Sequence, residues 1–244
     1  MLADVDIEVA PGEVVAFLGA SGSGKSTLLR LIAGLDRPTA GDITIDGRSV
    51  RGIDPRCAVV FQEPRLLPWR TLAANVAFGL PHGTPRGQGG TDVQHWLDVV
   101  GLTGFEHHRP RQISGGMAQR AGLARALARR PGVLLLDEPL GALDALTRLR
   151  MQDLLDEVQQ AAGTTTLLVT HDVDEALILA DRVLILRAGP DGAAGIAAAH
   201  RVDLPKPRDR ANPALAALRT TLLDELGLPR RGDPESAERK EISV

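Results

Sequence analysis

The sequence feature that most constrains the fold is the segment 19–27, which reads Gly-Ala-Ser-Gly-Ser-Gly-Lys-Ser-Thr. It matches the pattern Gly-x-x-x-x-Gly-Lys-Ser, follows the apolar run 13–18, and precedes leucines and isoleucines at helical spacing. A glycine-rich loop between a strand and a helix can turn its backbone N–H groups toward an anion, and the helix presents its positive end to the same anion. We therefore predict a polyphosphate-binding loop rather than a simple connection between strand and helix.

Two side chains of this loop have expected roles. Lys25 is expected to contact the β- and γ-phosphates, and the hydroxyl of Ser26 is expected to bind Mg²⁺. The predicted phosphate-binding residues are Gly19, Ala20, Ser21, Gly22, Ser23, Gly24, Lys25, Ser26 and Thr27.

A second group of candidate residues ends the apolar run 133–139, Val-Leu-Leu-Leu-Asp-Glu-Pro. A buried strand with this ending places Asp137 and Glu138 at the carboxyl edge of the sheet, where ligands of α/β proteins bind. Asp137 is the expected partner of Ser26 at magnesium, and Glu138 is placed to polarise an attacking water. The alternative is an ordinary acidic strand end.

The segment 113–120, Ile-Ser-Gly-Gly-Met-Ala-Gln-Arg, is a second candidate anion site. A helix N-cap explains the serine, but two successive glycines indicate close approach of a ligand to the backbone. Because a helix N-terminus attracts anions, one chain would carry two phosphate-binding surfaces. Two chains that meet head to tail could share one nucleotide between these surfaces.

The order of apolar segments predicts an α/β fold with a largely parallel sheet. We expect strands at 2–9, 13–18, 43–45, 57–61, 133–136, 165–169 and 182–186. We expect helices after residue 27 and at 72–80, 93–100, 114–129, 145–162 and 172–180, with a loop at 81–91. Residues 63–130 form an inserted helical subdomain in this prediction. Residues 188–200 have little periodicity, and the tail from residue 229 is polar and charged.

Composition limits the partners and the compartment. The net charge is −3, from 28 basic and 31 acidic residues, which disfavours nucleic acid as a main ligand. The single cysteine, Cys57, excludes an internal disulfide, fits a reducing compartment, and lies in an apolar run that predicts a core position. No apolar stretch is long enough for a membrane span, so we expect a soluble chain whose membrane role, if any, depends on a partner.

Over residues 1 to about 187, the order of these motifs resembles the nucleotide-binding subunit of ATP-binding cassette (ABC) transporters. The matching motifs are a Walker A loop at 19–27, a Q-loop at Gln62, a signature motif at Ser114, Gly115, Gly116 and Gln119, a Walker B strand at 133–138, a D-loop at 141–144 and a switch histidine at His171. The resemblance implies a P-loop NTPase core with an antiparallel β subdomain and the helical signature subdomain. It also implies a nucleotide-binding domain at 1–206, followed by a partly disordered tail at 207–244.

The resemblance implies roles for three residues that their own chemistry and spacing do not indicate. Gln62 is implied to sense magnesium and water and to couple the site to a membrane subunit, Asp144 to bridge two protomers, and His171 to contact the γ-phosphate. Without the resemblance, His171 is a polar strand end beside a helix capped by Asp172. The implied assembly binds ATP and Mg²⁺. It comprises a homodimer of this subunit, two transmembrane permease subunits and an extracytoplasmic substrate-binding protein, with the ATPase peripheral at the cytoplasmic face of the cell membrane.

Some stretches are similar to a narrower group, the importers of sulfonates, taurine and nitrate. These stretches are residues 66–69 and 75–80, and, for the aliphatic-sulfonate branch, 140–148, 151–154 and 201–208. Aliphatic-sulfonate import is therefore the preferred function, with taurine and nitrate as alternatives. A soluble ABC ATPase that acts on nucleic acid or ribosomes, and a regulatory module that does not hydrolyse ATP, are alternatives of other classes.

The sequence departs from the family pattern in two places. Ile113 stands where the family usually has leucine, which is a volume-conserving change. The family's adenine-stacking aromatic, usually tyrosine, would lie upstream of Met1, and the chain contains no tyrosine. We expect either that the natural start lies further upstream or that adenine is held weakly, at a cost of about 1–3 kcal/mol.

Overall fold

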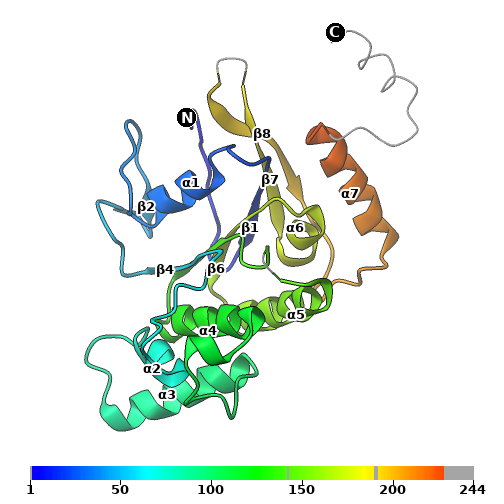
Figure 1. Ribbon diagram of the computed structural model, residues 1–244. Coiled ribbons are helices and arrows are strands. Elements are labelled where there is room, and N and C mark those ends of the chain that lie inside the picture. The colour runs from blue at the N-terminus through cyan, green and yellow to red at the C-terminus, as the bar shows by residue number, and fades with distance from the viewer. Residues whose placement is uncertain (1, 142, 190–191, 228–244) are drawn as a thin grey trace, which may run out of the picture.

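The computed structural model describes residues 2–141, 143–189 and 192–227, and its centre is a six-stranded sheet with the order β4-β5-β6-β1-β7-β8 (Figure 1). The strands are β1 (Val14–Leu18), β4 (Cys57–Val60), β5 (Val133–Asp137), β6 (Thr165–Thr170), β7 (Arg182–Ala188) and β8 (Ala194–Arg201). Neighbouring strands from β4 to β7 pair in parallel, and β8 pairs with β7 antiparallel. The expected α/β fold with a largely parallel sheet is confirmed.

The central strands are apolar on both faces because helices cover both sides of the sheet. In β1, Val15 and Phe17 face the cluster that contains Leu28 of helix α1 (Lys25–Ile32). Val14, Ala16 and Leu18 face the larger cluster on the other side. That cluster includes residues of α4 (Gly115–Ala128), α5 (Ala145–Ala162) and α6 (Val173–Leu179). Because successive side chains of a strand point to opposite faces of the sheet, β1 contributes to the cores on both sides.

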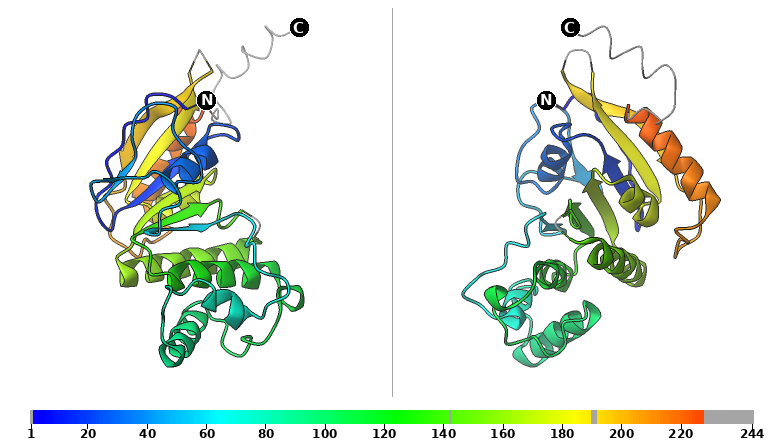
Figure 2. Two further views of the ribbon diagram at one scale, coloured as in Figure 1. Left: turned by 90° about the vertical axis from the view of Figure 1, so that its left-hand side faces the viewer. Right: turned by 45° about the vertical axis from the view of Figure 1, so that its right-hand side comes forward.

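Residues 63–130 contain the expected helices, which lie beyond the sheet in Figure 2. They are α2 (Leu72–Ala77), α3 (Arg86–Val99) and α4, and the structure adds a short 3-10 helix, η1 (Pro110–Gln112), that was not expected. The expected loop at 81–91 is wrong in its second half, because α3 begins at Arg86. This first part of α3 contains several glycines, and each of them disfavours the helix by about 1 kcal/mol relative to alanine. Buried Val93 and Leu97 hold the second half against the core, and the helix extends from there.

The antiparallel β subdomain is a small hairpin of β2 (Thr44–Ile45) and β3 (Arg48–Ser49). The strand expected at 2–9 is wrong: residues 3–10 lie in no strand, and only Leu2 makes an isolated bridge, with Ala194. Asp4 has a φ of 50°, which interrupts an extended backbone. The alternation of side chains was informative nonetheless, because Val5, Ile7 and Val9 pack against the core on the α1 side.

Two elements near the C-terminal end were not expected. Strand β8 occupies most of the segment 188–200, and helix α7 (Pro213–Glu225) lies within the range 207–244 that was expected to be a tail. Leu215 and Leu222 of α7 are buried in the same core cluster as α6. Residues 228–244 of the expected tail, and Ala142 of the expected D-loop, lie outside the described residues. The division of the chain at residue 206 stays a prediction.

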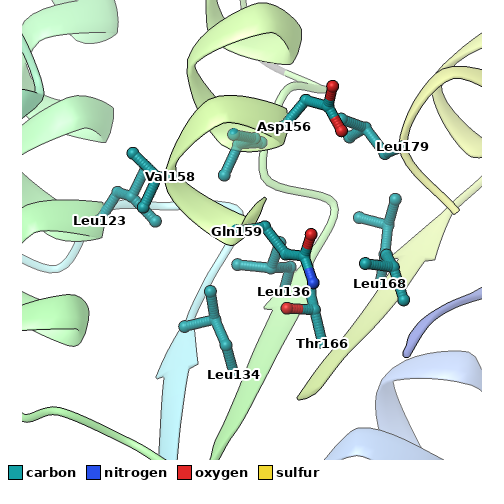
Figure 3. Close-up of a pocket in the computed structure, with 11 residues that line it drawn as sticks. Leu123, Leu134, Leu136, Asp156, Val158, Gln159, Thr166, Leu168 and Leu179 are labelled. Carbon is teal, nitrogen blue, oxygen red and sulfur yellow. The ribbon is translucent and has the colours of Figure 1, made fainter. Parts of the chain in front are cut away.

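A small cavity of about 20 Å³ lies beneath α5, between α4, α6 and the sheet (Figure 3). Its wall is mostly leucine and valine, and Gln159, its most prominent amide, already donates to the carbonyls of Gly12 and Thr164. We interpret it as a packing gap, since ligands of parallel sheets bind at the carboxyl ends of the strands. Within the described ranges, no helix combines the length and the apolar character that crossing a membrane requires.

Candidate functional site

The predicted phosphate-binding loop joins β1 to α1, as the sequence pattern requires. Gly22 and Gly24 have φ values of 83° and 87°, a region that suits glycine, and Gly24 is the N-cap of α1. Gly19 is required for a different reason. A Cβ at this position would lie 2.5 Å from the carbonyl oxygen of Leu186 in β7. The loop therefore depends on backbone conformations that favour glycine at 22 and 24, and on a close backbone contact that leaves no room for a Cβ at 19.

Lys25, the first residue of α1, is held inside this loop. Its Nζ donates to the carbonyls of Gly19 at 2.7 Å and Ala20 at 2.9 Å, and the residue is only 5% exposed. Burial lowers the pKa of Lys25, and the negative charges of Glu138 and Asp137 act in the opposite direction. The ammonium group thus lies in the electrostatic field of both carboxylates.

The hydroxyl and the carboxylate expected to share a magnesium ion lie side by side. Ser26 Oγ donates to Asp137 Oδ1 at 2.9 Å. A hydroxyl and a carboxylate are hard oxygen ligands, which is the donor type that Mg²⁺ prefers. Ser23 is also buried in the loop, and its Oγ has no hydrogen-bond partner in the described part of the chain. These donors fit a Mg²⁺–polyphosphate group.

Three side chains from three adjacent strand ends meet, with Glu138 between the other two. Gln62 follows β4, Glu138 follows β5 and His171 follows β6. Gln62 Nε2 donates to Glu138 Oε2 at 3.3 Å, and His171 Nδ1 lies 3.3 Å from Glu138 Oε1. Glu138 has a φ of 46°, and its backbone N–H donates to the carbonyl of Val169 at 2.9 Å. Gln62 therefore contacts the candidate base, and the described structure gives it no contact with Ser26 or Asp137.

The candidate signature residues lie at the start of α4. Ser114 is the N-cap, and its Oγ accepts from the N–H of Met117 at 3.3 Å. A Cβ on Gly115 would meet nothing within 4 Å, whereas one on Gly116 would lie 2.9 Å from Cγ2 of Thr147. The glycine at 116 is thus explained by packing inside this chain, and the glycine at 115 is not.

Gln119 is different from the other signature residues, because it is buried. It is 4% exposed, and its Nε2 donates to the carbonyl of Phe61 at 3.2 Å. It connects α4 to the residue before Gln62. In the described structure, Gln119 therefore holds α4 against the segment that leads to Gln62, and its predicted role in contacting a second chain stays a prediction.

Asp144 is the N-cap of α5. Its Oδ1 accepts from the N–H of Thr147 at 3.1 Å, and hydrogen bonding with the side chain and the backbone of Thr147 lowers the pKa of Asp144. The side chain is exposed, and the preceding Leu143 is buried. The cap fixes the turn that the family resemblance assigns to contact with a second protomer.

The sequence prediction gave Asp172 as the cap of the helix after His171, which the structure confirms, but it did not include the other groups that hold this turn. Thr170, Asp172 and Glu175 are linked by hydrogen bonds, and Arg148 of α5 pairs with Asp172 at 3.2 Å. A signal was present in the sequence, since Asp172 and Glu175 have the spacing of a capping box. The glutamate nevertheless bonds to Thr170 and not to the N-cap backbone.

Comparisons with known proteins agree with this geometry. The ABC transporter family profile matches residues 2–141. The chain is 50% identical to an aliphatic sulfonates import ATP-binding protein of Xanthomonas axonopodis pv. citri, over 86% of this chain and 83% of that protein. It is 47% identical to the nitrate import ATP-binding protein NrtC of Synechococcus elongatus, over 94% of this chain and 36% of that longer protein.

Among solved structures, the ATP-binding cassette MJ0796, described as a dimer in a post-hydrolysis state with ADP and Pi, superposes with a TM-score of 0.72. It is 32% identical in sequence, and the match covers 84% of this chain and 91% of the cassette. The cbiO1 protein of Clostridium perfringens, part of the transporter complex cbiONQ, superposes with a TM-score of 0.75 at 25% identity, over 98% of this chain and 92% of that one. With its phosphate-binding loop, paired carboxylates and fold all in agreement, the chain belongs to the ABC transporter family.

Proposed function

We propose that this chain is the ATP-binding and ATP-hydrolysing subunit of an importer for aliphatic sulfonates. The observation that carries the proposal is 50% identity, across 86% of the chain, to a protein named as such a subunit. Further relatives that are also named as aliphatic sulfonates import ATP-binding proteins are 48–50% identical over 92–96% of the chain. Nitrate import is a second candidate, because NrtC is 47% identical over 94% of this chain. Taurine, which rests on motif resemblance alone, is the third.

In this proposal the phosphate-binding loop holds the triphosphate, and Lys25 neutralises charge on its terminal phosphates. Glu138 accepts the proton of the attacking water, a role that typically contributes about 10²–10⁴ in rate. His171 and Gln62, which both lie 3.3 Å from the Glu138 carboxylate, hold that carboxylate in position and can contact the γ-phosphate and the water. The convergence of these three side chains supports the assignment.

Ser26 and Asp137 would hold a magnesium ion, with Gln62 as the further ligand that the motif resemblance implies. When bound, Mg²⁺ neutralises the negative charge that develops on the phosphate oxygens. The chain's own contribution is the orientation of the two oxygens, which the 2.9 Å hydrogen bond between Ser26 and Asp137 already brings together.

A second copy of the chain would complete each site through Ser114, Gly115, Gly116 and Gln119, with Asp144 at the contact between protomers. ATP closes such a dimer and hydrolysis reopens it, because the two states differ in affinity for nucleotide. Exposed apolar residues support a further partner: Trp69 is 68% exposed and Phe78 is 65% exposed, both in the region that follows Gln62. We assign this surface to the permease subunits. A separate substrate-binding protein would deliver the sulfonate, and the ATPase would lie at the cytoplasmic face.

Two measurements test the proposal. Steady-state phosphate release by the purified chain with ATP and Mg²⁺ tests the enzymatic part, and Lys25→Ala should abolish nucleotide binding. Deletion of the gene should prevent growth on an alkanesulfonate as the only sulfur source while growth on sulfate continues. Parallel cultures on taurine and on nitrate distinguish the alternatives, since only the imported compound becomes unusable. Growth of the deletion strain on every one of these compounds would contradict an import function for them.

A further inference from the structure

Arg148, on the first turn of α5, bridges two turns that border the site. Its Nη2 donates to the carbonyl of Leu143 at 3.2 Å, and its Nη1 donates to Oδ2 of Asp172 at 3.2 Å. Leu143 directly precedes Asp144, and Asp172 directly follows His171. A planar guanidinium can hold two acceptors in a fixed relative orientation. One side chain therefore connects the turn before α5 to the turn before α6.

The turn that carries His171 is closed by short hydrogen bonds, so that it can move as one unit. Thr170 Oγ1 accepts from the N–H of Asp172 at 3.0 Å and donates to Oε2 of Glu175 at 2.7 Å. Oδ1 of Asp172 accepts from the N–H groups of Asp174 at 2.9 Å and Glu175 at 3.1 Å. A displacement of Asp172 would thus carry His171 with it, and with His171 the contact to Glu138.

Two buried polar atoms of this network have no partner within the described ranges. They are Nε of Arg148 and Oε1 of Glu175. Burial raises the pKa of Glu175 to about 7, while the Thr170 hydrogen bond and the positive charge of Arg148 act in the opposite direction. The unused donor, Nε of Arg148, and the unused acceptor, Oε1 of Glu175, give this network spare hydrogen-bonding capacity. If the guanidinium shifts, a new hydrogen bond can therefore offset one that is lost.

We infer that Arg148 is a positioning residue that transmits the contact at Asp144 to His171 within the same chain. The inference rests on the proposed function, in which a second copy contacts Asp144. When that contact forms, the shift of residues 143–144 moves the guanidinium, and Asp172 transmits the displacement to the turn of His171 and so to the 3.3 Å contact between His171 and Glu138. Arg148 has no contact with residues 19–27 in the described structure, so its loss should impair turnover and spare ATP binding.

Steady-state ATP hydrolysis by the full chain tests this directly, with Arg148→Met against Arg219→Met. Arg148 and Arg219 of α7 both line a groove of about 420 Å³. Arg219 donates to Asp174 at 2.9 Å, but it contacts neither Leu143 nor Asp172. We expect Arg148→Met to lower kcat about 10-fold with KM for ATP changed by less than about 2-fold, and Arg219→Met to resemble the wild type. Arg148→Lys, which can hold only one of the two acceptors, should recover part of the loss.

A double-mutant cycle with Asp144→Ala separates transmission from a local packing effect. If Arg148 relays the contact, the Asp144→Ala Arg148→Met double variant is no slower than the slower single variant, within about 2-fold. Asp144→Ala combined with Arg219→Met should give independent, multiplicative effects. If Arg148→Met does not fold, Asp172→Asn replaces it, because the amide retains the cap of α6 and removes the charge pair.

The opposite results overturn the inference. They are multiplicative effects in the Asp144–Arg148 cycle, an Arg148→Met variant with wild-type kcat, or a rise in KM without a fall in kcat. These failures differ from failure of the proposed function. A folded wild-type chain that hydrolyses no ATP overturns the proposed function, and the inference that depends on it fails too.

Discussion

Glu138 combines an unusual backbone with a specific set of side-chain contacts. A residue with a side chain in the left-handed region costs on the order of 1–3 kcal/mol, and such strain persists where surrounding contacts hold it. Here the backbone N–H bonds to Val169, and the carboxylate lies between Gln62 and His171. Such strain beside titratable groups is typical of sites that perform chemistry.

The first prediction concerns Glu138→Gln. The amide keeps the size of the side chain and can still accept from Gln62, but it cannot take a proton from water. We expect phosphate release to fall about 10²–10⁴-fold while ATP still drives association of two chains. A phosphate assay and size-exclusion chromatography with ATP measure the two properties. Normal phosphate release from this variant would exclude Glu138 as the base.

Cys57 supports a second prediction at this scale. The structure buries it, as the apolar run predicted, and burial raises the pKa of its thiol from 9.0 to about 11. Because the folded pKa is the higher one, the thiolate is scarce at pH 8, and stability decreases as pH rises above about 9. A thiol reagent at pH 8 should label the denatured chain quickly and the folded chain slowly. Rapid labelling of the folded chain would contradict this.

The sequence predicted which residues form the site better than it predicted their contacts. Gln62, Glu138 and His171 each follow an apolar strand, which places all three at one sheet edge. They meet because β4, β5 and β6, which are consecutive in the chain, are also neighbours in the sheet; the position of β1 between β6 and β7, which brings the phosphate-binding loop beside them, does not follow from the order of the strands in the chain. The burial of Gln119 was likewise not predictable, because its partner, the carbonyl of Phe61, lies 58 residues away.

At the scale of elements, Arg208 ties the segment after β8 to the end of α6. Its side chain is 1% exposed, and its guanidinium donates to the carbonyls of Leu177, Ile178, Ala180 and Val202. Burial lowers the pKa of Arg208, with Asp181 and Asp156 acting in the opposite direction. The guanidinium thus satisfies carbonyls that the short helix α6 leaves free at its C-terminus.

The third prediction follows from these bonds. Arg208→Met should lower the free energy of unfolding by about 2–4 kcal/mol, because buried carbonyls lose their donors. For a chain of this size, the loss corresponds to a fall in melting temperature of about 4–16 °C. Thermal unfolding measures it, with Arg219→Met as the control, since Arg219 forms an exposed ion pair worth at most about 1 kcal/mol. Equal melting temperatures for the two variants would contradict the assigned role.

Elements with periodic apolar residues were predictable, and those that depend on a neighbour were not. Helix α5 begins and ends at the expected residues, since its caps Asp144 and Gly163 are visible in the sequence. Strand β8 consists largely of alanine and glycine, so its sequence shows no clear alternation of apolar and polar residues. It forms because β7 offers an unpaired edge. Residues 2–9 show the converse: their apolar and polar residues alternate, but only Leu2 pairs with a strand, through its bridge to Ala194.

At the scale of the whole molecule, the two candidate phosphate-binding surfaces belong to different elements. Lys25 begins α1 on one side of the sheet, and Ser114 begins α4 on the other (Figure 1). Within the described part of the chain, no hydrogen bond or ion pair joins the two surfaces. This arrangement supports a site that two copies complete, as does the superposition on a cassette whose structure is dimeric.

Gly115→Ala offers the sharpest test of that arrangement, because this glycine is not required by its own chain. A Cβ there meets nothing within 4 Å, and alanine is the better helix former, so the melting temperature should stay equal or rise slightly. If a nucleotide held by a second copy approaches this backbone, the methyl group should displace it and lower ATP hydrolysis by about 10²-fold. Gly116→Ala is the matched control: its Cβ would lie 2.9 Å from Thr147, so stability and activity should fall together. Wild-type hydrolysis by Gly115→Ala would show that no triphosphate reaches this surface, and the two-chain site would have to be abandoned.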